Sequence, residues 1–459
     1  MMNIFLNMAP IPILVAVSLL GVILKTHGAV EQLIAIYVLA ASLAFCASIF
    51  SRQRSGIDFM ISMFFLVFLG LPGLAQISIG YFPWGAKLAP EHLALAISLL
   101  SVCHLFYIIG VSAGLSRHQV PKAIPKPLDA GFSKFYTKWA WGIAIIASAI
   151  CVTLGPNVLF AARFGGQDAY VGISQQLLFI SRSISLVAIV MIITLTRWAI
   201  SSGLRRQNMI ALLVYLPFFF VNNYFQSLPR FVLFGLLISV SCCFIDYRKP
   251  IVKLATTLVA IFMLFTVFPV IKLIAAEGAT FDKLIESIQR VSPSRYLLNV
   301  DFDGFMQITS TIQYLESEPI RWGNNFLGVV LFFVPRGLWE GKPIDTGVIV
   351  SEGLGYWYNN VASPLPAEAL MGIGLVGPII VFLLLGFFVA RIEHHAGSLG
   401  RTNRTLHSFF LYAVTMGFIT IIMRGALNAV APQFASGFVV LGLIWFARRN
   451  RIVWRADPA

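Results

Sequence analysis

Charged side chains are scarce in this sequence, and their scarcity excludes an ordinary soluble protein. Only 11% of the 459 residues are charged, whereas 58% are hydrophobic. Soluble domains carry about 25% charged residues and roughly 45–50% apolar ones. Membrane barrels need strands that alternate apolar and polar residues, but runs such as 379–390 are apolar throughout. The composition therefore predicts an all-α polytopic membrane protein, because one anchor could not account for so many apolar runs.

Cysteine and histidine are missing from the places where they would suggest chemistry. The five cysteines all lie inside apolar runs, which argues against a disulfide framework and against a zinc site. The long loop at 276–370 contains no histidine, and His92 is the nearest candidate on the same side of the membrane. Nucleophilic chemistry of the Ser–His or Cys–His type therefore has little support, and no metal is expected.

Apolar runs of near-membrane length predict about twelve transmembrane helices. The chain then divides into helices one to nine (1–275), a long loop (276–370), and helices ten to twelve with a basic tail (371–459). The approximate limits of the helices are 4–24, 30–50, 57–79, 92–115, 138–155, 175–196, 208–221, 231–246, 251–275, 371–391, 406–423 and 431–447.

The basic residues are distributed unevenly between alternate loops. One set of alternate loops, together with the C-terminal tail, holds most of the 33 lysines and arginines. Because cytoplasmic loops collect such residues, this set and both termini are predicted to be cytoplasmic. The bias also accounts for the net charge of +14, so no nucleic-acid partner is expected. The short loops of the outer set hold Lys25, Lys87, Arg163, Arg230 and Arg424.

The long outer loop is expected to be structured. Apolar spacing predicts an amphipathic helix at 280–290 on the membrane surface, and a second helix at 302–317. Residues 325–334 are apolar but too short to span, which is typical of a re-entrant or interfacial segment. A turn-rich stretch at 335–355 follows. Long structured loops often carry function, so the site is sought here.

Arginines on the outer side form the first candidate site. Arg163, Arg230, Arg336 and Arg424 come from four separate loops that a bundle could bring together. Converging guanidinium groups suit a phosphate or pyrophosphate. Any single arginine at this depth is more typical of snorkelling toward lipid phosphates, whereas the group as a whole favours function. Arg182 lies inside the sixth helix and needs a carboxylate or carbonyl partner there, which leaves structural and functional roles open.

Carboxylates of the long loop form the second candidate. Glu368 directly precedes the tenth predicted helix, where it would face outward at the membrane surface and could act as a general base. A glutamate stabilised by the helix dipole at an exposed N-terminus is the alternative. Asp301 and Asp303 lack the other ligand positions of a calcium loop. They also lack the Gly-rich strand–helix unit of a nucleotide site.

Three stretches carry a pattern that is similar to a known family. They are SLPRFVLFG at 227–235, VPRGLWEGKP at 334–343 and PAEALMGIGLVG at 366–377. The first opens a helix with an arginine, the second has a Pro-Arg…Trp…Lys-Pro order, and the third leads a glutamate into a Gly-rich span. Together with the topology, they resemble the O-antigen polymerase family, whose members polymerise lipid-linked oligosaccharide repeat units.

The resemblance implies a GT-C-type glycosyltransferase of the bacterial inner membrane that makes a cell-surface polysaccharide such as O-antigen. The donor would be a chain on undecaprenyl pyrophosphate, which carries its own leaving group, so no cofactor is implied. Other partners would be membrane lipids and a chain-length-regulating co-polymerase. Glu368 would be the catalytic base. The pyrophosphate would be held by Arg163, Arg230, Arg336, Lys342 and Arg424.

Three alternatives remain open at this point. An O-antigen ligase would transfer the finished chain to a lipid core, although a histidine base of the kind found in ligases cannot be placed. A flippase for lipid-linked sugars would be expected to show repeat-related halves and a site near the midplane. A structural subunit of an envelope complex would have no chemistry.

Overall fold

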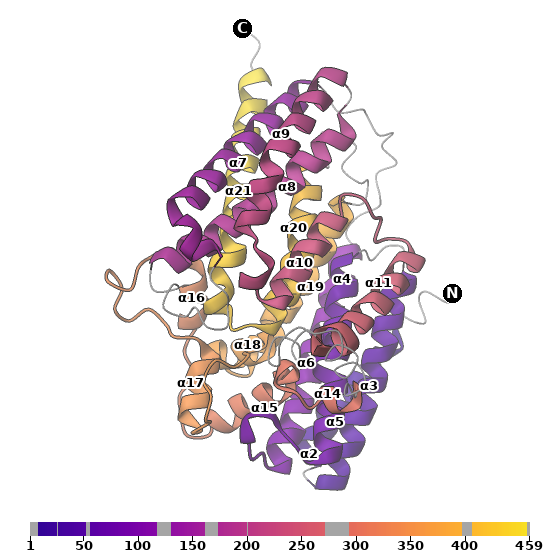
Figure 1. The fold of residues 1–459 in the computed structure, drawn as a ribbon. Coiled ribbons are helices and arrows are strands. Elements are labelled where there is room, and N and C mark those ends of the chain that lie inside the picture. The colour runs from indigo at the N-terminus through magenta and orange to yellow at the C-terminus, as the bar shows by residue number, and fades with distance from the viewer. Residues whose placement is uncertain are drawn as a thin grey trace.

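The computed structural model describes residues 8–24, 26–51, 56–116, 130–160, 173–199, 201–270, 293–396 and 406–456 (Figure 1). Every regular element within these ranges is a helix, as predicted. Nine helical stretches among the described residues are long and apolar enough to cross a membrane. The chain is therefore a multi-pass α-helical membrane protein.

Each of the nine membrane-length stretches overlaps one predicted span. The second is continuous but contains a π-helical segment, as does the sixth. The nine stretches are α3 (His27–Phe50), α4–η1–α5 (Gly56–Met63, Phe64–Gly70, Leu71–Ile79), α6 (Pro90–Ser116), α7 (Ala130–Leu159), α8 (Ile173–Trp198), α11–η5 (Pro250–Phe262, Met263–Val267), α19 (Val376–Ala396), α20 (Leu406–Arg424) and α21 (Leu427–Ala456).

The three remaining predicted spans are helical but do not reach membrane length and apolarity together. They correspond to α2 (Pro10–Ile23), α9 (Ser202–Asn222) and α10 (Arg230–Ser241). Helices α2 and α10 are apolar but short. Helix α9 is long enough, but it begins with the polar sequence SGLRRQN. Twelve crossings therefore stay a prediction, whereas nine helical stretches of the described residues are long and apolar enough to cross.

The loops on the predicted outer side contain short helices. Helix α15 confirms a helix within 302–317, and α16 is a short helix within 325–334. The turn-rich prediction for 335–355 is wrong at α17, and the predicted helix at 280–290 lies outside the described residues. These elements are η2 (Pro83–Gly85), η4 (Phe225–Ser227), α14 (Pro293–Tyr296), η6 (Val300–Phe302), α15 (Gly304–Tyr314), α16 (Asn324–Val330), α17 (Thr346–Gly353) and α18 (Leu365–Ile373).

The tenth predicted helix, 371–391, is divided in the structure. Helix α18 ends at Ile373, and α19 begins only at Val376. Gly374 lies between them with φ of +68°, a conformation that residues with a Cβ rarely adopt. Glu368 therefore belongs to a separate short helix and does not stand at the entrance of a span. The sequence pattern missed this break because the run stays apolar across it.

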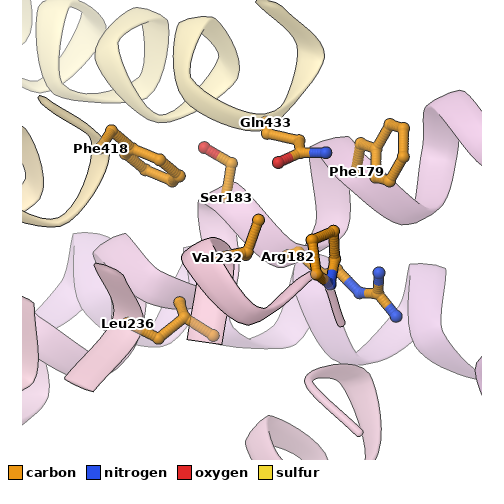
Figure 2. Close-up of a pocket in the computed structure, with 8 residues that line it drawn as sticks. Phe179, Arg182, Ser183, Val232, Leu236, Phe418 and Gln433 are labelled. Atoms are coloured by element: carbon orange, nitrogen blue, oxygen red, sulfur yellow. The ribbon is translucent and has the colours of Figure 1, made fainter. Parts of the chain in front are cut away.

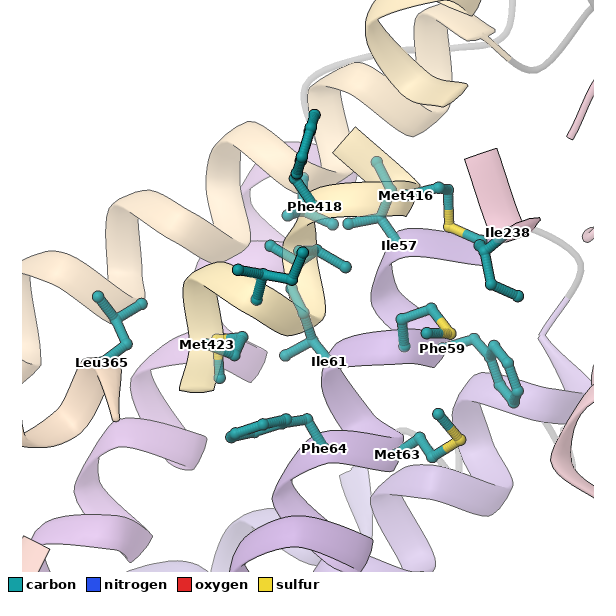
Figure 3. Packing of buried hydrophobic residues seen from close by; sticks show 14 of the residues in the cluster. Ile57, Phe59, Ile61, Met63, Phe64, Ile238, Leu365, Met416, Phe418 and Met423 are labelled. Atoms are coloured by element: carbon teal, nitrogen blue, oxygen red, sulfur yellow. The ribbon is translucent and has the colours of Figure 1, made fainter. Parts of the chain in front are cut away.

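Helix α20 is the centre of the bundle. It contacts α4, α8, α10, α19 and α21, and most of its side chains are buried. In Figure 1, α10 and α20 lie between α2–α6 and the group formed by α7, α8, α9 and α21. Side chains of α4, η1 and α20, among them Ile61, Phe64 and Met423, pack together in this core (Figure 3). Both ends of α20 are thereby fixed against several partners.

Helices α10 and α20 approach each other closely at two glycines. A Cβ built on Gly235 would collide with the backbone oxygen of Gly417. Small residues of this kind allow membrane helices to pack backbone to backbone. Arg230 begins α10 and Arg424 ends α20. Arg424 also stacks on the ring of Phe231, with its Cζ 4.7 Å from the ring centroid, so the two arginines lie at the same end of this helix pair.

We expect Gly235→Ala to destabilise the protein. The added methyl group meets backbone atoms that cannot rotate away, so the helices must separate, at a cost of about 1–3 kcal/mol. Gly142→Ala in α7 is the matched control, since nothing lies within 4 Å of its Cβ position. The midpoint of thermal denaturation in detergent should fall for the first variant only. An unchanged midpoint for Gly235→Ala would contradict the close approach.

Candidate functional site

The acidic segment Asp301–Asp303 is held against the bundle by a buried amide. The side-chain Nε2 of Gln76, on α5, donates hydrogen bonds to the backbone oxygens of Phe302 at 2.9 Å and Leu297 at 3.4 Å. The Phe302 ring stacks on Phe68 at 5.6 Å. A buried backbone oxygen needs a donor, and Gln76 supplies it from a membrane helix. The segment is therefore fixed at the end of α5.

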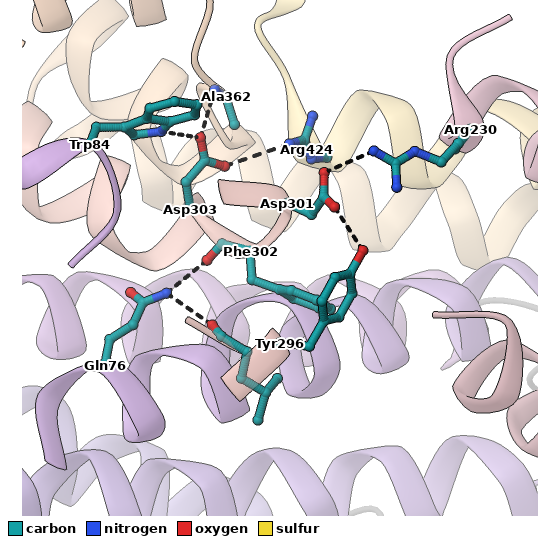
Figure 4. Close-up of polar contacts among 10 residues, drawn as sticks. Gln76, Trp84, Arg230, Tyr296, Asp301, Phe302, Asp303, Ala362 and Arg424 are labelled. Carbon is teal, nitrogen blue, oxygen red and sulfur yellow. Dashed lines mark hydrogen bonds and ion pairs between the residues drawn. The ribbon is translucent and has the colours of Figure 1, made fainter. Parts of the chain in front are cut away.

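Two arginines from different helices reach the two aspartates of this segment (Figure 4). Arg230 Nη2 lies 3.5 Å from Asp301 Oδ1, and Arg424 Nη2 lies 3.6 Å from Asp303 Oδ1. Charge-assisted hydrogen bonds are usually about 2.7–2.9 Å, so both pairs are loose. The arginine side chains retain 28% and 26% of their accessible surface, respectively. Part of each arginine side chain therefore remains accessible to solvent.

Asp303 is the most deeply buried member of this group. Trp84 Nε1 donates to its Oδ2 at 3.0 Å, and the backbone amide of Ala362 donates to the same oxygen at 3.3 Å. Burial raises the pKa of Asp303, and Arg424 acts against that shift together with these two donors. Asp301 accepts a shorter hydrogen bond, 2.7 Å, from the Tyr296 hydroxyl. Each aspartate thus has neutral donors in addition to its arginine.

Glu368 is completely buried, so the alternative of an exposed helix N-terminal glutamate is wrong. Its Oε2 accepts hydrogen bonds from Asn325 Nδ2 at 2.8 Å and from the Thr346 hydroxyl at 2.7 Å. Its Oε1 accepts from the Leu427 amide at 3.1 Å. Burial raises the pKa of Glu368, and these hydrogen bonds oppose the shift. Glu368 therefore joins α16, α17 and α21, which the sequence separates widely.

Asp345 lies beside this glutamate at the start of α17. Burial raises the pKa of Asp345 to about 6, and the neighbouring Glu368 adds to the shift, while Arg336 opposes it. Two neighbouring carboxyl groups resist simultaneous ionisation, because each negative charge makes it harder for the other group to lose its proton. Asp345 is only half-buried, whereas Glu368 has no exposed surface. Of the two, only Asp345 keeps exposed surface.

Arg336 and Lys342 hold their own turn and do not join Arg230 and Arg424. The Arg336 guanidinium donates to the backbone oxygens of Lys342 and Pro343 at 2.8 and 3.2 Å. Lys342 Nζ donates to the oxygens of Phe332 and Val334, both at 2.8 Å. Burial and the neighbouring Arg336 lower the pKa of Lys342. These cations belong to the Asp345 side of the site.

One short turn links the two groups of charged residues. Arg424 ends α20 and reaches Asp303, while the Leu427 amide at the start of α21 reaches Glu368. Gly425 lies between them with φ of +70°, and a Cβ there would collide with the backbone oxygen of Ser363. The turn between α20 and α21 therefore packs directly on the segment before α18. The Asp303 group contacts the residue before this turn, and the Glu368 group contacts the residue after it.

The remaining sequence candidates lie elsewhere. Arg163 is outside the described residues. Arg182 finds the predicted carbonyl partner, since its Nε donates to Asn222 O at 3.0 Å and its Nη2 to the Ser227 hydroxyl at 2.6 Å. It borders a cavity of about 10 Å³ between α8, α10, α20 and α21 (Figure 2), room for about one water molecule. His92 Nε2 lies 2.8 Å from Glu316 Oε1.

Sequence reasoning missed the role of Asp301 and Asp303. The sequence argues against a metal or nucleotide site at these residues, but it does not indicate that they are partners for the arginines. The available signal was two acidic residues in a loop on the same predicted side as Arg230 and Arg424. Within the described ranges, no group of three or more His, Cys, Asp or Glu side chains could hold a metal ion.

Comparison of the chain with protein-family models, with curated proteins and with solved structures finds no match. The site geometry and the sequence resemblance therefore carry the functional argument.

The ion pair between Arg424 and Asp303 yields a stability prediction. Arg424→Ala leaves a buried carboxylate with only the Trp84 and Ala362 donors, which should cost about 1–3 kcal/mol. Asp303→Asn should cost less, because Arg424 is partly exposed and can turn to solvent.

Thermal denaturation of both single variants and the double variant gives the coupling between the two residues. The double variant should resemble Asp303→Asn rather than the sum of both losses. Strict additivity would show that the two side chains do not interact.

Proposed function

We propose that the protein is a GT-C-type glycosyltransferase that polymerises undecaprenyl-pyrophosphate-linked oligosaccharide repeat units. It works on the outer face of the bacterial cytoplasmic membrane, with twelve crossings and both termini inside. The observation that supports the proposal is that Arg230 and Arg424, from the ends of two different helices, both reach the short segment that contains Asp301 and Asp303. The resemblance of 227–235, 334–343 and 366–377 to O-antigen polymerases supports it.

The arginine pair suits a pyrophosphate for a physical reason. Two guanidinium groups repel each other, and Asp301 and Asp303 balance their charges. The two ion pairs are nevertheless long, at 3.5 and 3.6 Å. A pyrophosphate carries several oxygens that can accept parallel N–H donors, which a guanidinium presents as a planar fork. Donors already in place stabilise the negative charge that grows on the leaving group. Arg230 and Arg424 take this role.

The carboxyl pair supplies the base. The acceptor hydroxyl oxygen bonds to the anomeric carbon of the donor sugar, and the bond from that carbon to the pyrophosphate oxygen breaks. The pyrophosphate leaves with the electron pair, and the hydroxyl proton moves to Asp345. Glu368, placed behind Asp345, helps to raise the pKa of Asp345 to about 6. A base with a pKa near the working pH is effective. In this proposal the base is therefore Asp345, and Glu368, for which the sequence predicted that role, adjusts the pKa of Asp345.

The ligase alternative is favoured by one observation, the contact between His92 and Glu316. A histidine oriented by a carboxylate is a typical general base. His92 lies near the start of α6 and shares no hydrogen bond with Asp303 or Glu368 among the described residues. If His92→Gln abolished transfer while Asp345→Asn did not, the ligase would become the better assignment.

A reconstituted assay tests the function directly. Purified protein in lipid vesicles should convert lipid-linked repeat units into longer chains with nothing else added. Arg230→Ala should abolish polymer, and Arg230→Lys should restore only part of it, because the bidentate fork is lost. Arg321→Ala is the control, since that arginine is also predicted to lie on the outer side and is exposed. Full activity of Arg230→Lys would show that simple charge suffices.

The pH dependence tests the base. The rate should rise as pH increases through about 6, because Asp345 must lose its proton to act as a base. Asp345→Asn should lower the rate by about 10²–10⁴-fold and remove this rise. Glu368→Gln should move the rise to lower pH, because it removes a charge that holds the Asp345 pKa up. An unchanged profile in Asp345→Asn would place the base elsewhere.

A further inference from the structure

Three aromatic side chains form a cluster beside the Asp303–Arg424 pair. The Trp84 ring stacks on Tyr358, with centroids 4.6 Å apart and an interplanar angle of 17°. Trp357 meets Trp84 edge to face at 5.3 Å and 62°. Trp84 comes from η2, between α5 and α6, whereas the other two follow α17 in the long loop. We call these three residues the aromatic platform.

The platform combines an anchored ring with an exposed one. Trp84 is half-buried, and its backbone has φ of +60°, which is rare for a bulky residue and costs of order 1–3 kcal/mol. Such a conformation persists only where the surroundings fix it, and the hydrogen bond from Trp84 Nε1 to Asp303 does so. Trp357, in contrast, keeps 75% of its surface exposed. Trp84 is therefore fixed beside Asp303, and the exposed indole of Trp357 lies against it.

We propose that the platform binds a sugar ring of the oligosaccharide chain, and this rests on the proposed function. The C–H bonds on one face of a pyranose form a weakly positive, apolar surface that stacks on the negative face of an aromatic ring. Trp357 is 75% exposed, so most of its indole surface is open to solvent. The occupant is the saccharide portion of the lipid-linked substrate, because the platform is continuous with the arginines through Asp303.

Membrane anchoring is the competing explanation for an exposed tryptophan. Tryptophans gather at both interfaces of a bilayer, where the ring sits at headgroup level. Trp322 provides the comparison, since it is 83% exposed, lies in the same long loop and belongs to no aromatic pair among the described residues. An anchoring role would be shared by both tryptophans and would tolerate another large apolar side chain. A stacking role requires an aromatic ring at 357.

The experiment measures binding rather than catalysis. Oligosaccharides are released by mild acid from the lipid-linked pool of the organism that encodes the chain, labelled at the reducing end, and titrated against the full protein in nanodiscs. Trp357→Ala and Trp357→Leu should each weaken binding roughly three- to tenfold. Trp357→Phe should retain most of the affinity, and Trp322→Ala should match the wild type.

The outcomes separate this proposal from the proposed function. Wild-type affinity in Trp357→Leu, an equal loss in Trp322→Ala, or no binding by the wild type would each overturn the platform. If polymer forms normally while Trp357→Ala leaves binding unchanged, the platform is wrong and the polymerase stands. If the wild type binds but never polymerises, while Trp357→Ala and Trp357→Leu bind more weakly, the polymerase is wrong and the sugar site stands.

Discussion

The contact between Arg424 and the buried Asp303 is the interaction on which the site depends. A carboxylate with 1% of its side chain exposed must be compensated, and its compensation comes from the last residue of the central helix α20. The pair therefore ties the long loop to the core of the bundle. Trp84 donates to the other oxygen of Asp303, so the loop between α5 and α6 is drawn to the same point. One aspartate thus joins three parts of the chain.

The turn after α20 extends this constraint to the second group of carboxylates. The Leu427 amide binds Glu368, so the start of α21 is fixed by the same few residues that place Arg424. Any shift of α20 along its axis would disturb Asp303 and Glu368 together. Close packing of Gly235 on Gly417 resists such a shift, because backbone atoms meet there without flexible side chains between them. The Asp303 group and the Glu368 group are therefore held in a fixed position relative to each other.

The sequence could predict what depends on local composition. Apolar runs of bilayer length predicted nine helices that the structure contains among the described residues. Each such helix satisfies its own backbone hydrogen bonds in hydrocarbon, so its sequence alone identifies it. The break at Gly374 was missed, since a positive φ leaves no mark in hydropathy. The burial of Glu368 was missed for a different reason. Its donors Asn325, Thr346 and Leu427 come from three distant elements, and no local pattern identifies them. The same holds for the partners of Arg230 and Arg424.

The two oxygens of Asp303 give the proposed site a direction. Oδ1 faces Arg424, whereas Oδ2 accepts a hydrogen bond from Trp84, one of the three residues of the aromatic platform. On the proposed function, the pyrophosphate lies on the Oδ1 side, next to Arg230 and Arg424, and the sugars lie on the Oδ2 side, against Trp357. A lipid-linked chain has the same order, with its anionic group between the lipid and the first sugar. In this proposal the aspartate positions Arg424 and Trp84 next to adjacent parts of one molecule, a distinction that a uniform cationic patch could not make.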